Sequence, residues 1–358
     1  MSAVKETRIL KLGTAASIAV AGVSLTACVG PPANQLAEKW GMIEATTTEC
    51  PVAVDESVTG DVTLGWQAIP NGDLIVYQQG LLESCMPNAH ITWQRFDGGG
   101  DVIQSFGAGD IDLATLGSAG VAKALSKPLS FDARVTWALD VIGTSESLVA
   151  RDPQDTTLQS LRGKKIAVPS ASTSHYSLLQ ALKQAGMSDT DVQLVFMAPD
   201  KILAGWQSGD IDAAWIWDPT LSQLKESGVV VTSSAETAKA GAPTYDLSMA
   251  RSDFVSDNPG FMNKWVELEN YAAKMISDSP DEAAPIIAEA LGTDADQVKI
   301  QLEGYQYPQA AEQDSENLLG GKLGEQLYDA AGFLKSVGQI DAVSDKDIYL
   351  NAPVTDYS

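Results

Sequence analysis

The chain is poor in the side chains that most often carry metal-dependent or nucleophilic chemistry, with two histidines and three cysteines in 358 residues. Structural and catalytic zinc sites take three or four ligands, mostly His and Cys, so we expect no metal site. The sequence also lacks a Gly-x-Ser-x-Gly elbow, a Walker-type phosphate loop and a dinucleotide fingerprint. These absences disfavour a hydrolase or a nucleotide-dependent enzyme, and no cofactor is expected.

Basic residues are scarce as well. The chain has 23 Lys and Arg against 47 Asp and Glu, which gives a formal net charge of −24. Such a charge repels the phosphate backbone, so nucleic acid is excluded as a partner. A small anionic ligand is not excluded, because donors inside a cleft outweigh distant charges that salt screens.

Long apolar runs are rare, and the one near the N-terminus has the form of an export signal. Three basic residues precede the uncharged stretch 12–27, which ends in Leu-Thr-Ala directly before Cys28. This arrangement resembles a bacterial lipoprotein signal, with residues 1–27 removed and Cys28 acylated. An ordinary signal peptide followed by an incidental Cys is the alternative. We expect an exported protein that is lipid-anchored to the outer face of the cytoplasmic membrane.

Two further cysteines follow the signal. In an oxidising exterior, an even pair is typical of a disulfide, and we expect Cys50 and Cys85 to form one; two buried thiols are the alternative. The disulfide would attach the end of a tether, residues 28–56, to the folded body.

A nine-residue motif occurs twice, one hundred positions apart. Phe-Gly-Ala-Gly-Asp-Ile-Asp-Leu-Ala at 106–114 is echoed by Trp-Gln-Ser-Gly-Asp-Ile-Asp-Ala-Ala at 206–214. Each copy predicts the end of a helix, a Gly turn and a short strand. Unless the similarity of these Gly-Asp turns is accidental, the motif indicates two α/β lobes of similar design with a cleft between them.

Strand-like and helix-like segments alternate along both halves of the chain, which is typical of α/β proteins with largely parallel sheets. Two similar segments, 148–151 and 248–251, are interpreted as crossovers between the lobes, so that lobe 2 is an insertion into lobe 1. The expected divisions are lobe 1 over 57–147, lobe 2 over 148–245, and a crossover with the C-terminal helices of lobe 1 over 246–358.

Three strand-to-helix turns carry candidate anion donors. The strongest is hydroxyl-rich and includes Ser172 and Thr173; the others hold Gly117 with Ser118, and the glycines 98–100. The first turn of a helix has unpaired N–H groups and a partial positive charge, which favour an anion. Simple helix capping by one Ser is the alternative for the hydroxyl-rich turn. Three such turns facing one cleft would favour an anion.

Two acids, Glu146 and Asp246, lie at the expected crossovers, where they would reach a ligand held between the lobes. They could hold an ammonium group, or they could be solvated hinge acids. Trp217 ends a strand near the cleft and could stack on a cation, whereas Trp215 is expected in the core.

Three segments, 168–179, 205–212 and 241–246, closely resemble the taurine-binding proteins of ABC importers, within a broader family that binds alkanesulfonates, nitrate and thiamine precursors. The resemblance implies a two-lobe periplasmic-binding-protein fold of type II, each lobe a mostly parallel sheet flanked by helices, with two crossover strands. It also implies a monomer that captures taurine for an ABC permease and its ATPase. By position, the ammonium end would meet Glu146, Trp217 and Asp246, and the sulfonate end would lie near Gln67, Gly117, Ser118, Ser172 and Thr173.

Two other functions remain open from the sequence. The protein could bind other aliphatic sulfonates or a related small anion. It could also be an enzyme or a ligand sensor built on the same fold.

Overall fold

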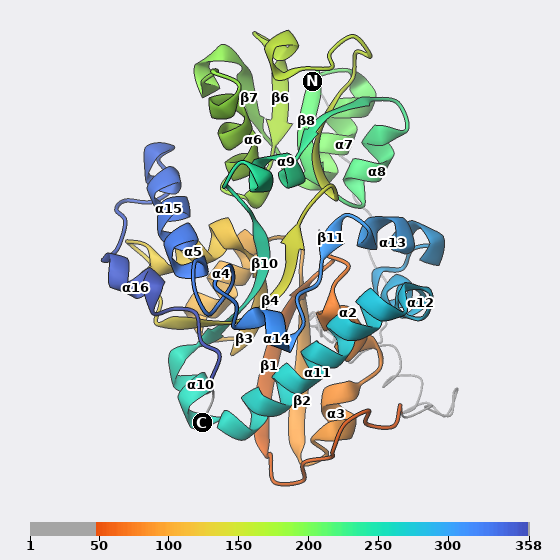
Figure 1. The fold of residues 1–358 in the computed structure, drawn as a ribbon, viewed down its shortest axis with the longest axis vertical. Coiled ribbons are helices and arrows are strands. Elements are labelled where there is room, and N and C mark those ends of the chain that lie inside the picture. Colours follow the sequence, from red (N-terminus) through yellow and green to blue (C-terminus); the bar gives the residue numbers. More distant parts are fainter. Residues whose placement is uncertain (1–47, 357–358) are drawn as a thin grey trace, which may run out of the picture. The chain divides into compact units, whose positions relative to one another are not determined.

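The computed structural model describes residues 48–356, which form two α/β lobes, each built around one sheet (Figure 1). A six-stranded sheet with the order β11-β4-β10-β3-β1-β2 forms lobe 1, and a five-stranded sheet with the order β7-β6-β8-β5-β9 forms lobe 2. In lobe 1, β1, β2, β3 and β4 run in one direction and β10 and β11 in the other; in lobe 2 only β5 is reversed. The predicted α/β class with two lobes and mostly parallel sheets is confirmed.

Lobe 1 is formed by both ends of the described chain. Its first elements are β1 (Gly60–Gln67), α2 (Gly72–Gln78), α3 (Leu81–Cys85), β2 (Ala89–Phe96), α4 (Gly99–Ala108), β3 (Leu113–Gly117), α5 (Ser118–Leu125) and β4 (Ala133–Ile142). The later ones are β10 (Tyr245–Arg251), α10 (Ser252–Asp257), α11 (Pro259–Asp278), α12 (Pro280–Leu291), α13 (Ala295–Leu302), β11 (Tyr305–Gln306), α14 (Ala310–Gln313), α15 (Leu323–Ser336) and α16 (Lys346–Leu350).

Helices cover both faces of this sheet. Successive side chains of a strand point to opposite faces, so Leu113 of β3 belongs to a cluster with α2, α11 and α12, whereas Ala114 belongs to a cluster with α5 and α15. These two clusters are the core of lobe 1.

Lobe 2 is a continuous segment of the chain. It consists of β5 (Glu146–Ala150), a 3-10 turn (Leu158–Leu161), β6 (Lys165–Val168), α6 (Thr173–Gln184), a second 3-10 turn (Asp189–Asp191), β7 (Gln193–Phe196), α7 (Pro199–Ser208), β8 (Ala213–Trp217), α8 (Thr220–Lys225), β9 (Val229–Ser233) and α9 (Ser234–Lys239). Trp215 is fully buried in one of its two core clusters.

The chain passes between the lobes at two short segments, 143–145 and 240–244. The interpretation of 148–151 and 248–251 as the crossovers is therefore wrong. Residues 148–150 pair inside the lobe 2 sheet in β5, and 248–251 pair inside the lobe 1 sheet at the end of β10, because their apolar pattern is that of buried strands.

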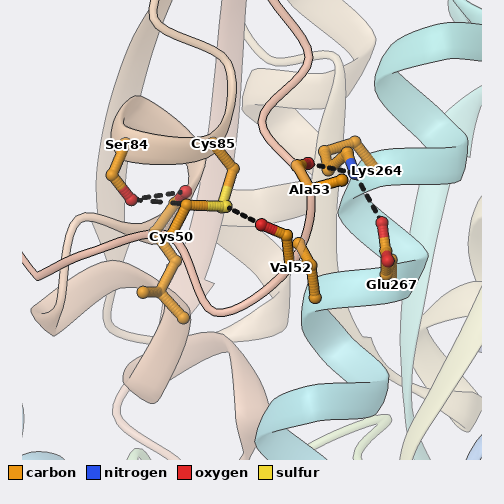
Figure 2. Close-up of a disulfide and its surroundings, with 8 residues drawn as sticks. Cys50, Val52, Ala53, Ser84, Cys85, Lys264 and Glu267 are labelled. Atoms are coloured by element: carbon orange, nitrogen blue, oxygen red, sulfur yellow. Dashed lines mark hydrogen bonds and ion pairs between the residues drawn. A yellow bond between two sulfur atoms is a disulfide. The ribbon is translucent and has the colours of Figure 1, made fainter.

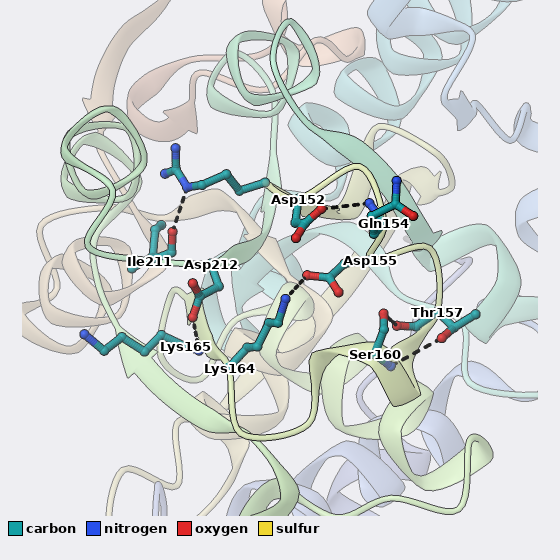
Figure 3. Close-up of polar contacts among 10 residues, drawn as sticks. Asp152, Gln154, Asp155, Thr157, Ser160, Lys164, Lys165, Ile211 and Asp212 are labelled. Atoms are coloured by element: carbon teal, nitrogen blue, oxygen red, sulfur yellow. Dashed lines mark hydrogen bonds and ion pairs between the residues drawn. The ribbon is translucent and has the colours of Figure 1, made fainter.

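The repeated motif makes the same hydrogen bonds in each lobe. In lobe 1, Asp112 donates its N–H to the carbonyl of Thr63 and accepts the N–H of Thr63 on its carboxylate, at 2.9 Å in both cases. In lobe 2, Asp212 donates to the carbonyl of Lys165 and accepts its N–H at 2.8 Å (Figure 3). Each Asp therefore joins the start of its strand to the neighbouring strand.

Cys50 and Cys85 form a disulfide whose Cα atoms lie 5.1 Å apart (Figure 2). Nearby, the ammonium of Lys264 on α11 donates to the carbonyl of Ala53 at 2.7 Å and pairs with Glu267. The segment that follows Cys50 is thus held against α3 and α11 of lobe 1.

The expected signal, residues 1–27, and Cys28 lie outside the described residues. Within residues 48–356, no helix combines the length and the apolar character that a bilayer crossing requires.

Candidate ligand-binding site

A cavity of about 500 Å³ lies between the two lobes and is lined by residues of both. Gln67 and Gly117 lie where β1 and β3 end, and the turn 169–173 follows β6. The cavity is therefore at the carboxyl ends of the parallel strands, which is where ligands bind in open α/β sheets.

Seven of the eight predicted ligand-binding residues line this cavity, and they come from both lobes: Gln67, Gly117, Glu146, Ser172, Thr173, Trp217 and Asp246. Ser118 is the exception. It is buried and its hydroxyl accepts the N–H of Tyr245 at 3.3 Å, so its side chain joins α5 to β10 instead of lining the cavity. All three predicted turns, including the glycines 98–100, line the cavity.

Glu146 begins β5 and is almost completely buried at the cavity wall. Its carboxylate accepts hydrogen bonds from Thr173 at 2.6 Å and from Ser234 at 2.9 Å. Burial raises the pKa of Glu146 to about 7, although the two hydroxyl donors act in the opposite direction. The alternative of a solvated hinge acid is therefore wrong for Glu146, which is a buried group with two fixed hydrogen-bond partners.

Asp246, on β10, lines the cavity from the lobe 1 side. Burial, followed by the negative charge of Glu146, raises its pKa to about 7. The charge of Glu146 thus raises the pKa of Asp246, and an arriving cation is strongly favoured beside the two acids because it stabilises both ionised forms.

Sequence reasoning missed a third acid, Asp140. It pairs with Asp246 across β4 and β10, is completely buried, and has no hydrogen-bond partner for either carboxylate oxygen within residues 48–356. Burial and then the charge of Asp246 raise its pKa well above the usual range. It does not line the cavity, so it lies behind the acidic wall. An Asp inside the apolar run of β4 was the available signal.

The hydroxyl-rich turn does both of the things expected of it. Ser172 caps α6, because its hydroxyl accepts the N–H of His175 at 3.1 Å and donates to the carbonyl of Pro169 at 2.7 Å. The hydroxyl of Thr173 is donated to Glu146. The donors that remain for an anion at this turn are the first backbone N–H groups of α6, which no intrahelical carbonyl satisfies.

Other cavity residues were not predicted. Lys123 on α5 is the one basic side chain among the lining residues that the structure describes. Tyr305 of β11 also lines the cavity and pairs with Ile142, next to the interlobe segment 143–145. Residues 196–199, from the end of β7 to the start of α7, form part of the lobe 2 wall. Gln67 donates its amide to the carbonyl of Thr115 at 2.8 Å, which fixes its orientation.

No group of three or more His, Cys, Asp or Glu side chains within residues 48–356 is arranged to hold a metal ion. The residues that line the cavity give it an acidic end, at Glu146 and Asp246, and the N-termini of several helices.

Comparison with known proteins gives consistent matches. A family model described as NMT1/THI5 like matches residues 93–283. The chain is 33% identical to the taurine-binding periplasmic protein of Escherichia coli K12 over 267 residues, covering 72% of this chain and 81% of that protein. It is 26% identical to a putative aliphatic sulfonates-binding protein of the same organism, covering 69% and 77%.

Among solved structures, the fold is similar to that of the periplasmic aliphatic sulphonate binding protein SsuA from Escherichia coli, with a TM-score of 0.67 at 22% identity. The match covers 82% of this chain and 92% of that one. At 22% identity, this similarity is evidence for a common fold only.

Proposed function

The chain belongs to the NMT1/THI5-like family, and from this premise we propose that it is an extracellular solute-binding protein that captures taurine between its lobes and delivers it to an ABC importer. The observation that carries the proposal is the acidic end of the cavity, where Glu146 of lobe 2 and Asp246 of lobe 1 face one space. The identity to a taurine-binding protein, at 33%, supports the same ligand.

The two ends of the cavity suit the two ends of an aminosulfonate. The ammonium group binds Glu146 and Asp246, with the ring of Trp217 beside it. The sulfonate binds the N-terminal N–H groups of α5 and α6, assisted by the amide of Gln67. Because the acids belong to different lobes, the cation joins the lobes when it binds, which favours closure around the ligand.

Anchoring and delivery are part of the proposal. An acylated Cys28 would hold the protein at the outer face of the membrane beside the permease, and a diacylglyceryl-type anchor is needed because one acyl chain binds only marginally. A Cys28→Ala variant is expected in the culture supernatant. Retention of that variant at the membrane after removal of the signal would contradict the anchor.

A second candidate is a binder of aliphatic sulfonates in general, favoured by the 26% identity to such a protein. A simple alkanesulfonate has no cation for the acid pair and would meet its negative charge. Catalysis is less favoured than either, because neither histidine lines the cavity among the residues described.

The test is calorimetric titration with taurine and ethanesulfonate, which differ by the ammonium group. We expect taurine to bind with a Kd near 1 µM or tighter, about −8 kcal/mol or better, and ethanesulfonate at least a hundredfold more weakly. The isosteric variant Glu146→Gln should bind taurine more weakly, so that the difference in Kd between taurine and ethanesulfonate becomes smaller than in the wild type. Equal binding of both ligands to the wild type would make the protein a general sulfonate binder, and binding of neither would remove the proposal.

A further inference from the structure

One side chain of lobe 1 packs against the first turn of α6 in lobe 2. Phe333, on α15, makes edge-to-face contacts with His175, at 5.4 Å between ring centroids, and with Tyr176, at 5.1 Å. His175 also contacts Phe196, which lines the cavity, at 5.0 Å. Neither Phe333 nor His175 lines the cavity itself, so this aromatic cluster lies directly behind its wall.

The imidazole of His175 is linked to the cavity wall by a hydrogen bond. Its Nδ1 accepts the N–H of Ala171 at 3.3 Å, and Ala171 has a φ of +56°, in the left-handed region that an L-residue adopts only at a cost. Ala171 lies in the turn 169–173 that lines the cavity. His175 therefore supports the unusual backbone of the proposed anion-binding turn.

The accepting role of Nδ1 places the imidazole proton on Nε2, and Nε2 is buried without a hydrogen-bond partner within the described residues. The side chain is 1% exposed. Among residues 48–356, the imidazole has no polar partner at Nε2 and is contacted by the rings of Phe196 and Phe333, so ring packing holds the side chain in place.

The same turn meets lobe 1 at a second point. A methyl group built on Gly117, at the start of α5, would lie 3.1 Å from Cγ2 of Thr173. The first turn of α6 therefore contacts lobe 1 at two points. Thr173 lies against Gly117, and His175 and Tyr176 lie against Phe333. Between these two contacts the N-termini of α5 and α6 are brought together at the cavity.

We propose that Phe333 and His175 are positioning residues for ligand binding: their ring contact across the lobes holds the turn 169–173 against α5 and stabilises the ligand-binding arrangement of the lobes. The inference rests on ligand binding in the interlobe cavity, as proposed above. It adds that part of the closure free energy comes from residues that never touch the ligand, and such residues act mainly on the rate of ligand release.

The first experiment needs no ligand. Phe333→Leu is compared with the wild type by small-angle scattering, with Tyr328→Leu as the matched control, because Tyr328 is on the same helix and its ring packs on Tyr349 within lobe 1 at 5.6 Å. We expect a larger radius of gyration for Phe333→Leu alone, and recovery of the wild-type value in Phe333→Tyr. An unchanged radius in Phe333→Leu would overturn the proposal whatever the ligand is.

The second experiment measures ligand exchange by stopped flow with taurine as the probe, using the change in total tryptophan fluorescence, to which Trp217 in the cavity contributes. An aromatic pair contributes about 0.5–1.5 kcal/mol, so Phe333→Leu should raise the dissociation rate about two- to twelvefold and leave the association rate nearly unchanged. His175→Phe keeps a ring but removes the acceptor for Ala171, and should weaken binding without expanding the particle.

The outcomes separate the two proposals. An equal rise in dissociation rate for Tyr328→Leu and Phe333→Leu would show a general loss of stability and overturn the positioning role. If the wild type does not bind taurine, the proposed function fails, and the scattering comparison alone decides whether Phe333 holds the lobes together.

Discussion

At the scale of single residues, the acid pair makes the site sensitive to pH. The pKa of Glu146 and that of Asp246 are both raised to about 7. A bound ammonium favours the ionised carboxylates, so their pKa values fall on binding and protons are released. The affinity for taurine is therefore expected to rise as the pH increases from 5 to 8, by up to about tenfold per pH unit for each group that titrates.

Calorimetry in two buffers of different ionisation enthalpy measures this release directly. Glu146→Gln removes one of the two groups, so its pH profile should be flatter than that of the wild type. A Kd that stays constant from pH 5 to 8, with no proton released, would contradict an ionic role for the pair.

Asp140 gives a second prediction, on stability. Its pKa in the folded protein is raised by burial, while in the unfolded chain it is near 4. Folding must therefore keep a proton on Asp140, and the free energy of unfolding decreases as the pH rises from about 4 toward the raised value, by at most about 1.4 kcal/mol per pH unit. Asp140→Asn cannot ionise, so its stability relative to the wild type should increase with pH over this range.

Chemical denaturation at pH 4.5 and at pH 7.5 tests this expectation, with Asp110→Asn as the control because Asp110 is exposed. If Asp140→Asn destabilised the protein by the same amount at both pH values, Asp140 would have a structural hydrogen-bonding role and not carry a proton.

Seven of the eight predicted ligand-binding residues line the cavity, and five of these lie at the end of a strand or the start of a helix, where local rules apply: Gln67, Gly117, Ser172, Thr173 and Trp217. It missed Asp140 because the importance of this residue comes from its register with Asp246 on a strand more than one hundred positions away. The hydrogen bond between Ser118 and β10 was missed for the same reason, since its partner Tyr245 is also distant in sequence. The contact of Phe333 with His175 joins α15 to α6 and has no local signal at all.

At the scale of elements, the structure of the repeated motif could be predicted from the sequence because it depends on local backbone conformation. Gly109 and Gly209 end α4 and α7 in the left-handed conformation, with φ of 80° and 82°, which Gly adopts without penalty. The crossovers were misplaced because the apolar segments 148–151 and 248–251 belong to paired strands, whereas the links themselves, 143–145 and 240–244, are short and have no apolar run. The helix-like segment from Asp73 to Leu82 is broken into α2 and α3, where Gly80 has a φ of 61°.

The motif predicts equal energetic roles for two residues in different lobes. Asp112 and Asp212 each accept one backbone N–H from a neighbouring strand, and a hydrogen bond to a charged group contributes about 1.5–3 kcal/mol. Asp112→Ala and Asp212→Ala should each lower the free energy of unfolding by about 1–2 kcal/mol, since both carboxylates are partly exposed.

The preceding acids of the motif, Asp110 and Asp210, are exposed and provide matched controls. Their replacement by Ala should change stability by less than about 0.5 kcal/mol. Thermal unfolding of the four variants checks the pattern. A loss confined to one lobe would show that the two copies share a sequence but not a role.

At the scale of the whole molecule, the stabilising disulfide and the ligand cavity lie at opposite ends of the lobe 1 sheet. The disulfide between Cys50 and Cys85 lies at the end of the sheet where β2 begins, whereas the cavity lies where β1 and β3 end. A strand of eight residues spans about 23 Å, so the disulfide is too far away to shape the cavity. Its cross-link acts mainly on the unfolded chain, whose conformational entropy it reduces.

Replacing both cysteines by Ser should therefore lower the free energy of unfolding by about 2–4 kcal/mol and leave the Kd for taurine within about twofold of the wild type. Urea denaturation and calorimetry on the same preparation give both quantities. Lys264 would still hold the carbonyl of Ala53, so the segment after Cys50 keeps one attachment to α11 and local unfolding stays limited. A large loss of affinity would mean that the segment transmits strain through β1 to Gln67, and the separation of stability from binding in lobe 1 would be wrong.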